Sequence, residues 1–245
     1  MKFNKLDAKT LRQKVYDRLR HEIITGEILP GQSIKLRDIA GQFGVSLMPV
    51  REALWQLESE KIIVIESNRS IHVNELTTRG IQEAIEIRVM LETLAAQRAC
   101  ELRPDSAVPR VKSILRDMQS SLDKPKRYMM KNNQFHFAIY SYSNSAMLLQ
   151  MIDWLWARVG PYVFIHATKV GDLSPTMKCH EDIFEAFAEK DKEKMREALQ
   201  RDLKSYARFI IDYLELPTAH SEPFRLLIPI NSGHSAGEHE SGGAG

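Results

Sequence analysis

Residues 36–55, LRDIAGQFGVSLMPVREALW, constrain the fold of this chain more than any other segment. Two helices joined by a tight turn need a small residue where they touch, a glycine in the turn and apolar residues that fix the second helix. Ala40, Gly44 and Val50 stand at those three positions. The segment therefore predicts a helix-turn-helix, with helices at about 36–43 and 47–60.

The second of these helices has the start signals of an element that reads DNA. Ser46 is a natural N-cap, and Pro49 falls in the first turn, where its missing N–H costs little. A helix so placed can enter the major groove with its first residues against base edges. Arg51 on this helix and Arg37 on the preceding one could contact guanine or phosphate. An ordinary helix pair with surface arginines is the alternative interpretation.

A predicted β-hairpin follows directly. The β-branched runs 62–65 and 71–73 flank a polar turn, which is typical of two antiparallel strands. Two helices followed by a hairpin make a winged helix. This order makes an ordinary helix pair with surface arginines a weaker interpretation. The tip of the wing contains Arg69, a candidate minor-groove or phosphate contact.

The charge of the chain is segregated between two regions. The 245 residues suggest two domains at ~100–200 residues each, and the net charge is only +2. Residues 1–74 hold 12 Lys+Arg and 9 Asp+Glu, a balance of +3, whereas the remainder holds 22 and 23, a balance of −1. The asymmetry favours a polyanion-facing N-terminal module, although a solvated helix face explains it almost as well.

The cysteines and the apolar runs exclude other classes of protein. Cys100 and Cys179 are the two cysteines, which excludes a disulfide scaffold and favours a reducing cytoplasm. No apolar run reaches the roughly 18 residues of a membrane span, so we expect no membrane partner.

The remainder of the chain has helical periodicity. Between Thr77 and about Leu216 no segment alternates like a strand, and the breaks allow about six helices. We therefore expect a mainly α protein, with a winged helix-turn-helix at 1–74, an all-helical bundle at 75–216 and a disordered tail at 217–245. The breaks fall near Pro104, Pro125, Ser143-Asn144, Gly160-Pro161, Gly171–Pro175 and Lys190-Asp191.

The N-terminal region resembles the GntR family of bacterial transcription regulators. The resemblance covers residues 10–74 and is most specific at Phe43-Gly-Val-Ser and Pro49-Val-Arg-Glu-Ala-Leu. It implies that Ser46, Leu47, Met48 and Arg51 on the second helix face DNA, together with Arg37 and Arg69. Families of this kind carry arginine and threonine where Leu47 and Met48 stand, so the operator sequence does not carry over. The two apolar side chains could pack on thymine methyl groups.

Four polar residues of the C-terminal region lie on apolar helix stripes: Asn132, His136, His180 and Asp202. Polar groups that face a core need partners, because an unpaired buried carboxylate or imidazole costs several kcal/mol. One divalent ion could satisfy all four, and this donor set suits zinc, nickel, iron or manganese. Ordinary buried hydrogen bonds are the alternative.

The helical region is similar to the FCD effector domain of the FadR-like branch of that family. The resemblance spans about 77–214 and rests on Arg88-Val-Met-Leu-Glu92, Phe135-His136, Asn144 and His180. Many such domains bind a metal through Asp-x3-His on one helix and one histidine on each of two later helices, while others bind none. The resemblance places these ligands at Asn132, His136, His180 and Asp202. Asparagine replaces the first aspartate, and aspartate replaces the last histidine.

Arg88 is the candidate effector-binding residue. It follows Ile81, Ala84 and Ile85 at helical spacing, so we expect it to face inward. A guanidinium there could clamp a ligand carboxylate, or it could pair with Glu92 four residues on. In the domains that this region resembles, an arginine here lies beside the effector pocket.

Together these features predict a ligand-responsive, sequence-specific transcription regulator, with repression the more common outcome in the family. We expect a homodimer on a palindromic operator with half-sites about one helical turn apart, and a small organic acid as effector. The alternative from another class is a non-haem metal enzyme with a 2-His-1-carboxylate site. A third interpretation is an architectural DNA binder without an effector.

Overall fold

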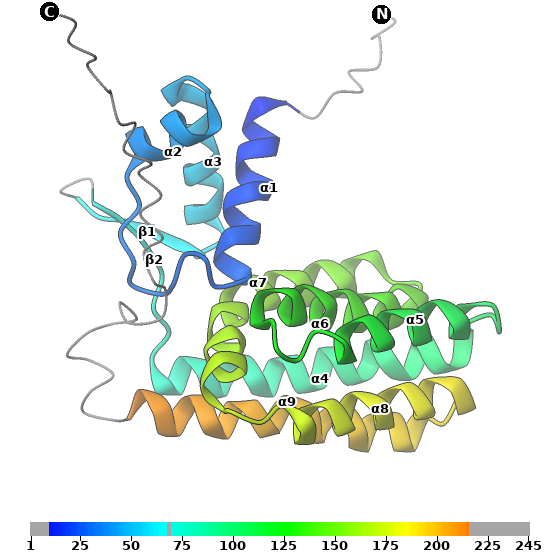
Figure 1. Cartoon of the computed structure of the whole chain (residues 1–245). Coiled ribbons are helices and arrows are strands. Elements are labelled where there is room, and N and C mark those ends of the chain that lie inside the picture. The colour runs from blue at the N-terminus through cyan, green and yellow to red at the C-terminus, as the bar shows by residue number, and fades with distance from the viewer. Residues whose placement is uncertain (1–9, 68–69, 216–245) are drawn as a thin grey trace, which may run out of the picture.

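The computed structural model describes residues 10–67 and 70–215. Arg69 and the tail expected at 217–245 lie outside these ranges. Within them the regular elements are helices apart from one two-stranded hairpin, as the sequence predicts. A small N-terminal part, here called the head, sits on a larger helical part, here called the body (Figure 1).

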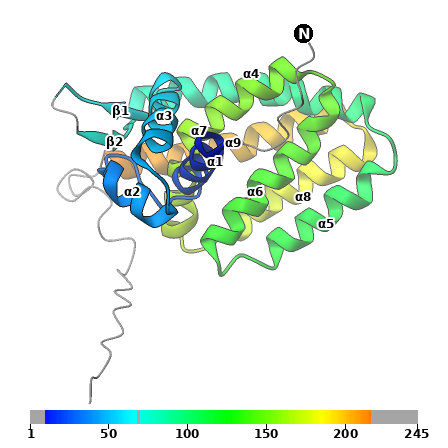
Figure 2. The same ribbon diagram turned by 90° about the horizontal axis from the view of Figure 1, so that it is seen from above.

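The head is a winged helix. Its helices are α1 (Leu11–Ile24), α2 (Leu36–Phe43) and α3 (Leu47–Ser59). Strands β1 (Ile63–Ile65) and β2 (Ile71–Val73) pair antiparallel with Val64 opposite His72. The hairpin projects from the head away from the body in both ribbon views (Figures 1 and 2).

The turn between α2 and α3 confirms the role expected of Gly44. This residue ends α2 with φ 63° and ψ 34°, a left-handed conformation that glycine adopts without a steric penalty. Ser46 occupies the N-cap position of α3, but its side chain makes no capping hydrogen bond. Ala40 and Val50 are buried where the two helices meet, as the motif requires.

The body consists of six α-helices and one short 3₁₀ helix, η1 (Ser141–Ser143), within the part of the chain that the structure describes. Apolar side chains from all six α-helices share one core. The α-helices are α4 (Thr78–Leu102), α5 (Ala107–Gln119), α6 (Pro125–Tyr140), α7 (Ala146–Lys169), α8 (Ser174–Glu189) and α9 (Lys192–Leu214).

Gly160-Pro161 bends a helix instead of ending one, because α7 continues through both residues, so the break expected there is wrong only as a helix boundary. Proline in a helix removes one backbone hydrogen bond and kinks the helix, and buried packing on both sides can still hold the two halves together. Gly160, Pro161 and their neighbours are buried, and the two halves of α7 run in different directions (Figure 1).

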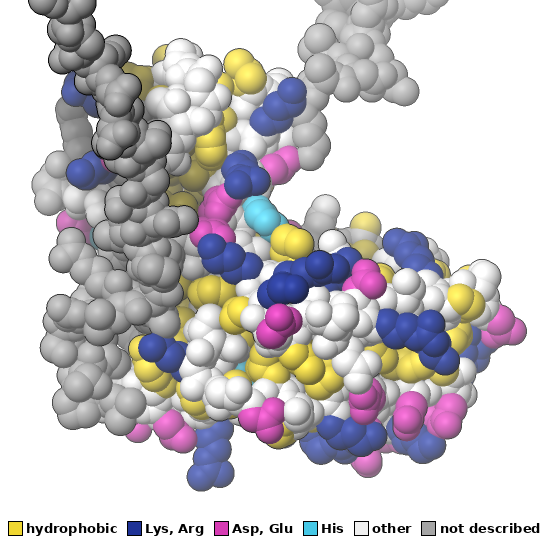
Figure 3. Space-filling model, in the orientation of Figure 1, with side chains coloured by type: hydrophobic (Ala, Val, Ile, Leu, Met, Phe, Trp, Pro, Cys, Tyr) yellow, Lys and Arg dark blue, Asp and Glu magenta, His cyan; other side chains and the backbone are white. Residues whose placement is uncertain are grey.

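Helix α7 also joins the head to the body. Ala157 on α7 packs into the core of the head, whereas Leu29 of the head packs into the core of the body. Arg20 of α1 donates to the Asp153 carboxylate at 2.7 Å. The surface is hollowed between the two parts, where a groove of about 420 Å³ separates α1 from α6 (Figure 3). No helix of the described residues is long and apolar enough to cross a membrane.

Candidate functional site

The exposed face of α3 carries the residues expected to read DNA. Ser46, Leu47, Met48 and Arg51 are all exposed, and so is Arg37 on α2. Met48 is 57% exposed although it is apolar, so this face is not filled by the head itself. Arg69, the sixth residue expected to contact DNA, lies outside the described residues.

Several of these side chains line a surface hollow of about 750 Å³ between α2, α3 and the wing. Arg37, Leu47 and Arg51 line it together with Trp55, which is 55% exposed. Sequence reasoning missed Trp55. The sequence feature that could have identified Trp55 is its position four residues after Arg51, because this spacing places both side chains on one helix face.

The four polar residues of the body converge at one buried point. The Nε2 atoms of His136 and His180 are 3.2 Å apart, and Asn132 Oδ1 lies 2.9 Å from His180 Nε2. The Asp202 carboxylate approaches His136 Nε2 at 3.5 Å and His180 Nε2 at 3.7 Å. Helices α6, α8 and α9 supply these groups, all of which are buried.

The outer hydrogen bonds of the two histidines fix where their ring protons lie. His180 Nδ1 is 2.8 Å from the Thr176 carbonyl oxygen, which only accepts, so Nδ1 carries the proton. Tyr140 donates its hydroxyl proton to Glu92 at 2.7 Å, so its oxygen accepts from His136 Nδ1 at 3.1 Å. In the neutral form that binds a metal, both rings therefore present the Nε2 lone pair to the centre of the cluster.

With both rings in that form, the cluster places acceptors against acceptors. Turning the Asn132 amide would supply a donor to His180, but His136 Nε2 would still face a lone pair and a carboxylate. A proton on Asp202 would have to span 3.5 Å, which is long for an O–H donor. Two ligand atoms about 2.1 Å from one metal ion lie about 3.0–3.4 Å apart, which the 3.2 Å between the Nε2 atoms matches.

Burial sets the protonation of the cluster. Desolvation, with repulsion from His180 and Arg88, lowers the pKa of His136 well below its ordinary value. Desolvation raises the pKa of Asp202, while His180 and Arg88 oppose that shift. A neutral imidazole is the form that binds a metal, and a cation would offset the cost of the buried carboxylate.

Arg88 faces inward, as expected, and pairs with Glu92. Its Nε donates to Glu92, its Nη1 donates to the Tyr206 hydroxyl, and its guanidinium lies 4.4 Å from the centre of the Trp156 ring. Burial alone would lower the pKa of Arg88, but Glu92 beside it turns the net shift upward. Because Glu92 also accepts from Tyr140, one chain of contacts joins Arg88 to the histidine pair.

A small cavity adjoins the cluster. Its volume is about 10 Å³, close to the minimum for one water molecule. Its wall includes Arg88 and His166, a buried histidine of α7 that sequence reasoning missed. Desolvation lowers the pKa of His166 to about 4, so this ring is neutral at pH 7. The sequence feature that could have identified His166 is its position two residues after Phe164, within a run of buried residues.

Comparisons with known proteins agree with both halves of this description. Residues 11–73 match the family described as bacterial regulatory proteins, gntR family, and residues 83–205 match the FCD domain. The HTH-type transcriptional regulator McbR of Escherichia coli (strain K12) is 29% identical over 199 residues, which cover 80% of this chain and 90% of that protein.

Two further similarities extend this result. The gluconate operon transcriptional repressor of Bacillus subtilis (strain 168) is 29% identical over 195 residues, covering 75% of this chain and 78% of the repressor. The solved structure of E. coli McbR/YncC superposes with a TM-score of 0.78 at 27% identity, and covers 84% of this chain and 99% of that one.

Proposed function

Because this chain belongs to the GntR family of bacterial regulatory proteins and carries an FCD domain, we propose that it represses transcription until a small organic acid binds its body. Members of the family are DNA-binding transcription regulators and not enzymes, so the non-haem enzyme alternative has no support. Regulators of this kind bind operators and small-molecule effectors and are typically dimers. The proposal assigns DNA binding to residues 1–74 and effector binding to residues 75–216.

The convergent lone pairs of His136 and His180 support a divalent metal ion in the body. The two nitrogen atoms, the Asp202 carboxylate and the Asn132 amide oxygen would hold it, and this donor set fits zinc, nickel, iron or manganese. The bound metal would supply a Lewis-acid position for a carboxylate or hydroxyl oxygen of the effector. Repression is proposed because the gluconate operon relative is named a repressor.

Unsatisfied polar groups around the cavity support an acid as the effector. Within the described part of the chain, the Tyr128 hydroxyl and Trp156 Nε1 are buried without a hydrogen-bond partner, and both residues line the cavity. Arg88 lines the same wall and supplies positive charge. Carboxylate and hydroxyl oxygens of a small organic acid would accept from these three donors.

The size of the cavity suggests how effector binding in the body would change the position of the head. A cavity of about 10 Å³ cannot hold an organic acid, so the wall must move when one enters. Trp156 and His166 place α7 in that wall. The same helix holds Arg20 of the head through Asp153 and packs Ala157 into the core of the head. A shift of α7 would therefore change how the head sits, which is a coupling between the two sites.

The metal assignment is tested by metal content and thermal unfolding of the full chain. Protein purified without chelators should contain about one divalent ion per chain, and chelation should lower its Tm because the ion binds only the folded state. His136→Ala combined with His180→Ala should lose the ion and the response to chelator. Asn132→Asp adds a carboxylate and should raise the metal affinity by at least about tenfold.

His21→Ala is the matched control, because His21 lies on α1 beside the groove and outside the cluster. It should keep both the ion and the Tm shift. A wild-type chain that contains no ion and takes up none of the four metals would contradict the metal site. Circular dichroism of the double variant separates loss of the ion from loss of the fold.

A further inference from the structure

The first turn of α3 exposes two apolar side chains at the end of the head that points away from the body (Figure 1). Leu47 is 42% exposed and Met48 is 57% exposed, and they are the first two residues of the helix. Leu47 also lines the hollow between α2, α3 and the wing, together with the apolar side chains of Trp55, Ile65 and Ile71. Leu47 and Met48, here called the α3 tip, therefore belong to an apolar contact surface and are not isolated surface residues.

The charges around the α3 tip favour a polyanion as its partner. Asp38 in the hollow and the exposed Glu52 on α3 are outnumbered by three cationic side chains that line the hollow: Lys35, Arg37 and Arg51. An apolar centre with a cationic rim suits a partner that sets apolar groups between rows of negative charge. The major groove of duplex DNA is such a partner, because thymine C5-methyl groups lie on its floor and phosphates follow both edges.

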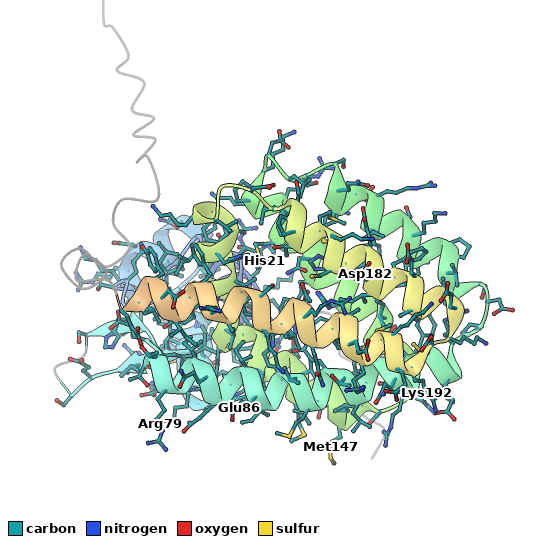
Figure 4. All side chains as sticks on the ribbon, turned by 90° about the horizontal axis from the view of Figure 1, so that it is seen from below. His21, Arg79, Glu86, Met147, Asp182 and Lys192 are labelled. Carbon is teal, nitrogen blue, oxygen red and sulfur yellow. The ribbon has the colours of Figure 1, made fainter. Side chains whose placement is uncertain are left out.

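The opposite end of the molecule mixes charges of both signs. Figure 4 shows the body from that end, where the labelled charged side chains are Arg79 and Glu86 on α4, Asp182 on α8 and Lys192 on α9. Asp182 also forms an ion pair with Lys178 at 3.0 Å. Neighbouring charges of opposite sign cancel much of their attraction for phosphate, so this end is a poorer match for a polyanion than the head.

We propose that Leu47 and Met48 recognise the C5-methyl group of thymine, so that the chain selects thymine at one or two positions of each operator half-site. The inference rests on the proposed function, because it assigns a base preference to the DNA-binding head. The thymine methyl is the one apolar group that a base pair presents in the major groove, whereas the other groups at base edges are hydrogen-bond donors or acceptors. Aliphatic side chains gain free energy by covering the methyl group and offer the donors and acceptors no strong partner.

The geometry of α3 places these thymines near the base pair that Arg51 reaches. Leu47 precedes Arg51 by four residues, which is about 6 Å along the helix and on the same face. Successive base pairs are about 3.4 Å apart, so the two side chains reach base pairs at most about two steps apart. The selected thymine should therefore lie within about two base pairs of the position at which Arg51→Ala changes the base preference.

Base analogues test the methyl contact by itself. An operator is selected from random duplexes with the full chain, and each thymine is then replaced in turn by deoxyuridine, which pairs in the same way but lacks the methyl group. At a thymine that the α3 tip covers, the dissociation constant should rise about fourfold for each methyl group removed. Where cytosine replaces that thymine, 5-methylcytosine should bind about fourfold more tightly than unmodified cytosine.

Three variants assign this preference to side chains. Leu47→Ala and Met48→Ala remove exposed groups, so neither opens a cavity in the core. Each variant should reduce the uracil penalty, and the double variant should bind the thymine and uracil duplexes equally. Met130→Ala is the matched control, because Met130 is an exposed apolar residue on α6 of the body, and it should keep the full penalty.

The outcomes separate this inference from the proposed function. Wild-type affinity that is unchanged by uracil at every thymine overturns the inference and leaves DNA binding in place. A uracil penalty that persists in the double variant also overturns it, because another side chain then covers the methyl group. Selected half-sites that contain no thymine have the same consequence. A chain that binds no duplex overturns the proposed function, and the inference fails with it.

Discussion

At the residue scale, Arg51 is the side chain on which DNA recognition should depend most. It is exposed in the second turn of α3 and lines the hollow that Arg37 and Leu47 also line. Arg51→Ala should weaken binding to an operator selected from random duplexes by about 1–3 kcal/mol, the value of one good base contact. A gel-shift titration measures the loss, and the exposed Arg110→Ala on α5 should bind as the wild type does. Equal affinity of the two variants would remove Arg51 from the interface.

His166 should make the body less stable as the pH falls. Desolvation lowers its pKa in the folded state to about 4, whereas an unfolded chain protonates near the ordinary value of 6.5. Between these values the unfolded state binds more protons, so the contribution of His166 to stability is present above pH 6.5 and is lost as the pH falls toward 4.

His166→Phe keeps a ring against Phe209 but cannot titrate. The Tm of this variant should therefore fall less than that of the wild type between pH 6.5 and 4.5. The other groups of the cluster titrate in both proteins and cancel in the difference. Parallel curves would show that His166 is not buried from water in the folded state.

The sequence predicted which polar residues of the body face inward, but not how they are joined. Helical spacing located Asn132, His136, His180 and Asp202 on apolar stripes, and all four are buried. It could not reveal that Tyr140 and Glu92 link the histidines to Arg88, because that chain of contacts crosses between helices distant in sequence. Helical periodicity shows which face of one helix is buried, but it does not show which residues of a neighbouring helix that face contacts.

At the element scale, α7 shows both the strength and the limit of sequence reasoning. Local signals located the other helices well, because caps and glycine turns act within a few residues, as Gly44 does. Gly160-Pro161 carries an equally strong local break signal, yet the helix continues. Tertiary packing on both sides of α7 outweighs the one lost hydrogen bond, and no local pattern contains that information.

Gly160→Ala tests how closely α7 and α1 are packed. An added Cβ would lie 3.0 Å from Ile24 Cγ2 and 3.2 Å from the Ile24 carbonyl oxygen, so α1 or α7 must shift. The variant should lose about 1–3 kcal/mol of unfolding free energy. Gly41→Ala is the control, because a Cβ on this exposed residue of α2 meets nothing within 4 Å and should be neutral or slightly stabilising. Denaturant titration compares them, and equal stabilities would mean that α1 and α7 move apart easily.

At the scale of the whole molecule, the net charge of +2 hides an uneven distribution of charge that matters for DNA binding. Residues 1–74 carry +3 and the remainder −1, so each head is only modestly basic. One head can neutralise few phosphates, and each phosphate neutralised contributes about −0.9 to the slope of log K against log salt. Tight, salt-sensitive binding therefore requires two heads on one duplex.

Affinities measured over a series of salt concentrations test this requirement. On a duplex that holds both half-sites of a selected operator, the salt slope should be about twice that on a duplex with one half-site. Equal slopes on both duplexes for the wild type would mean that only one head touches DNA. The palindromic arrangement would then be wrong.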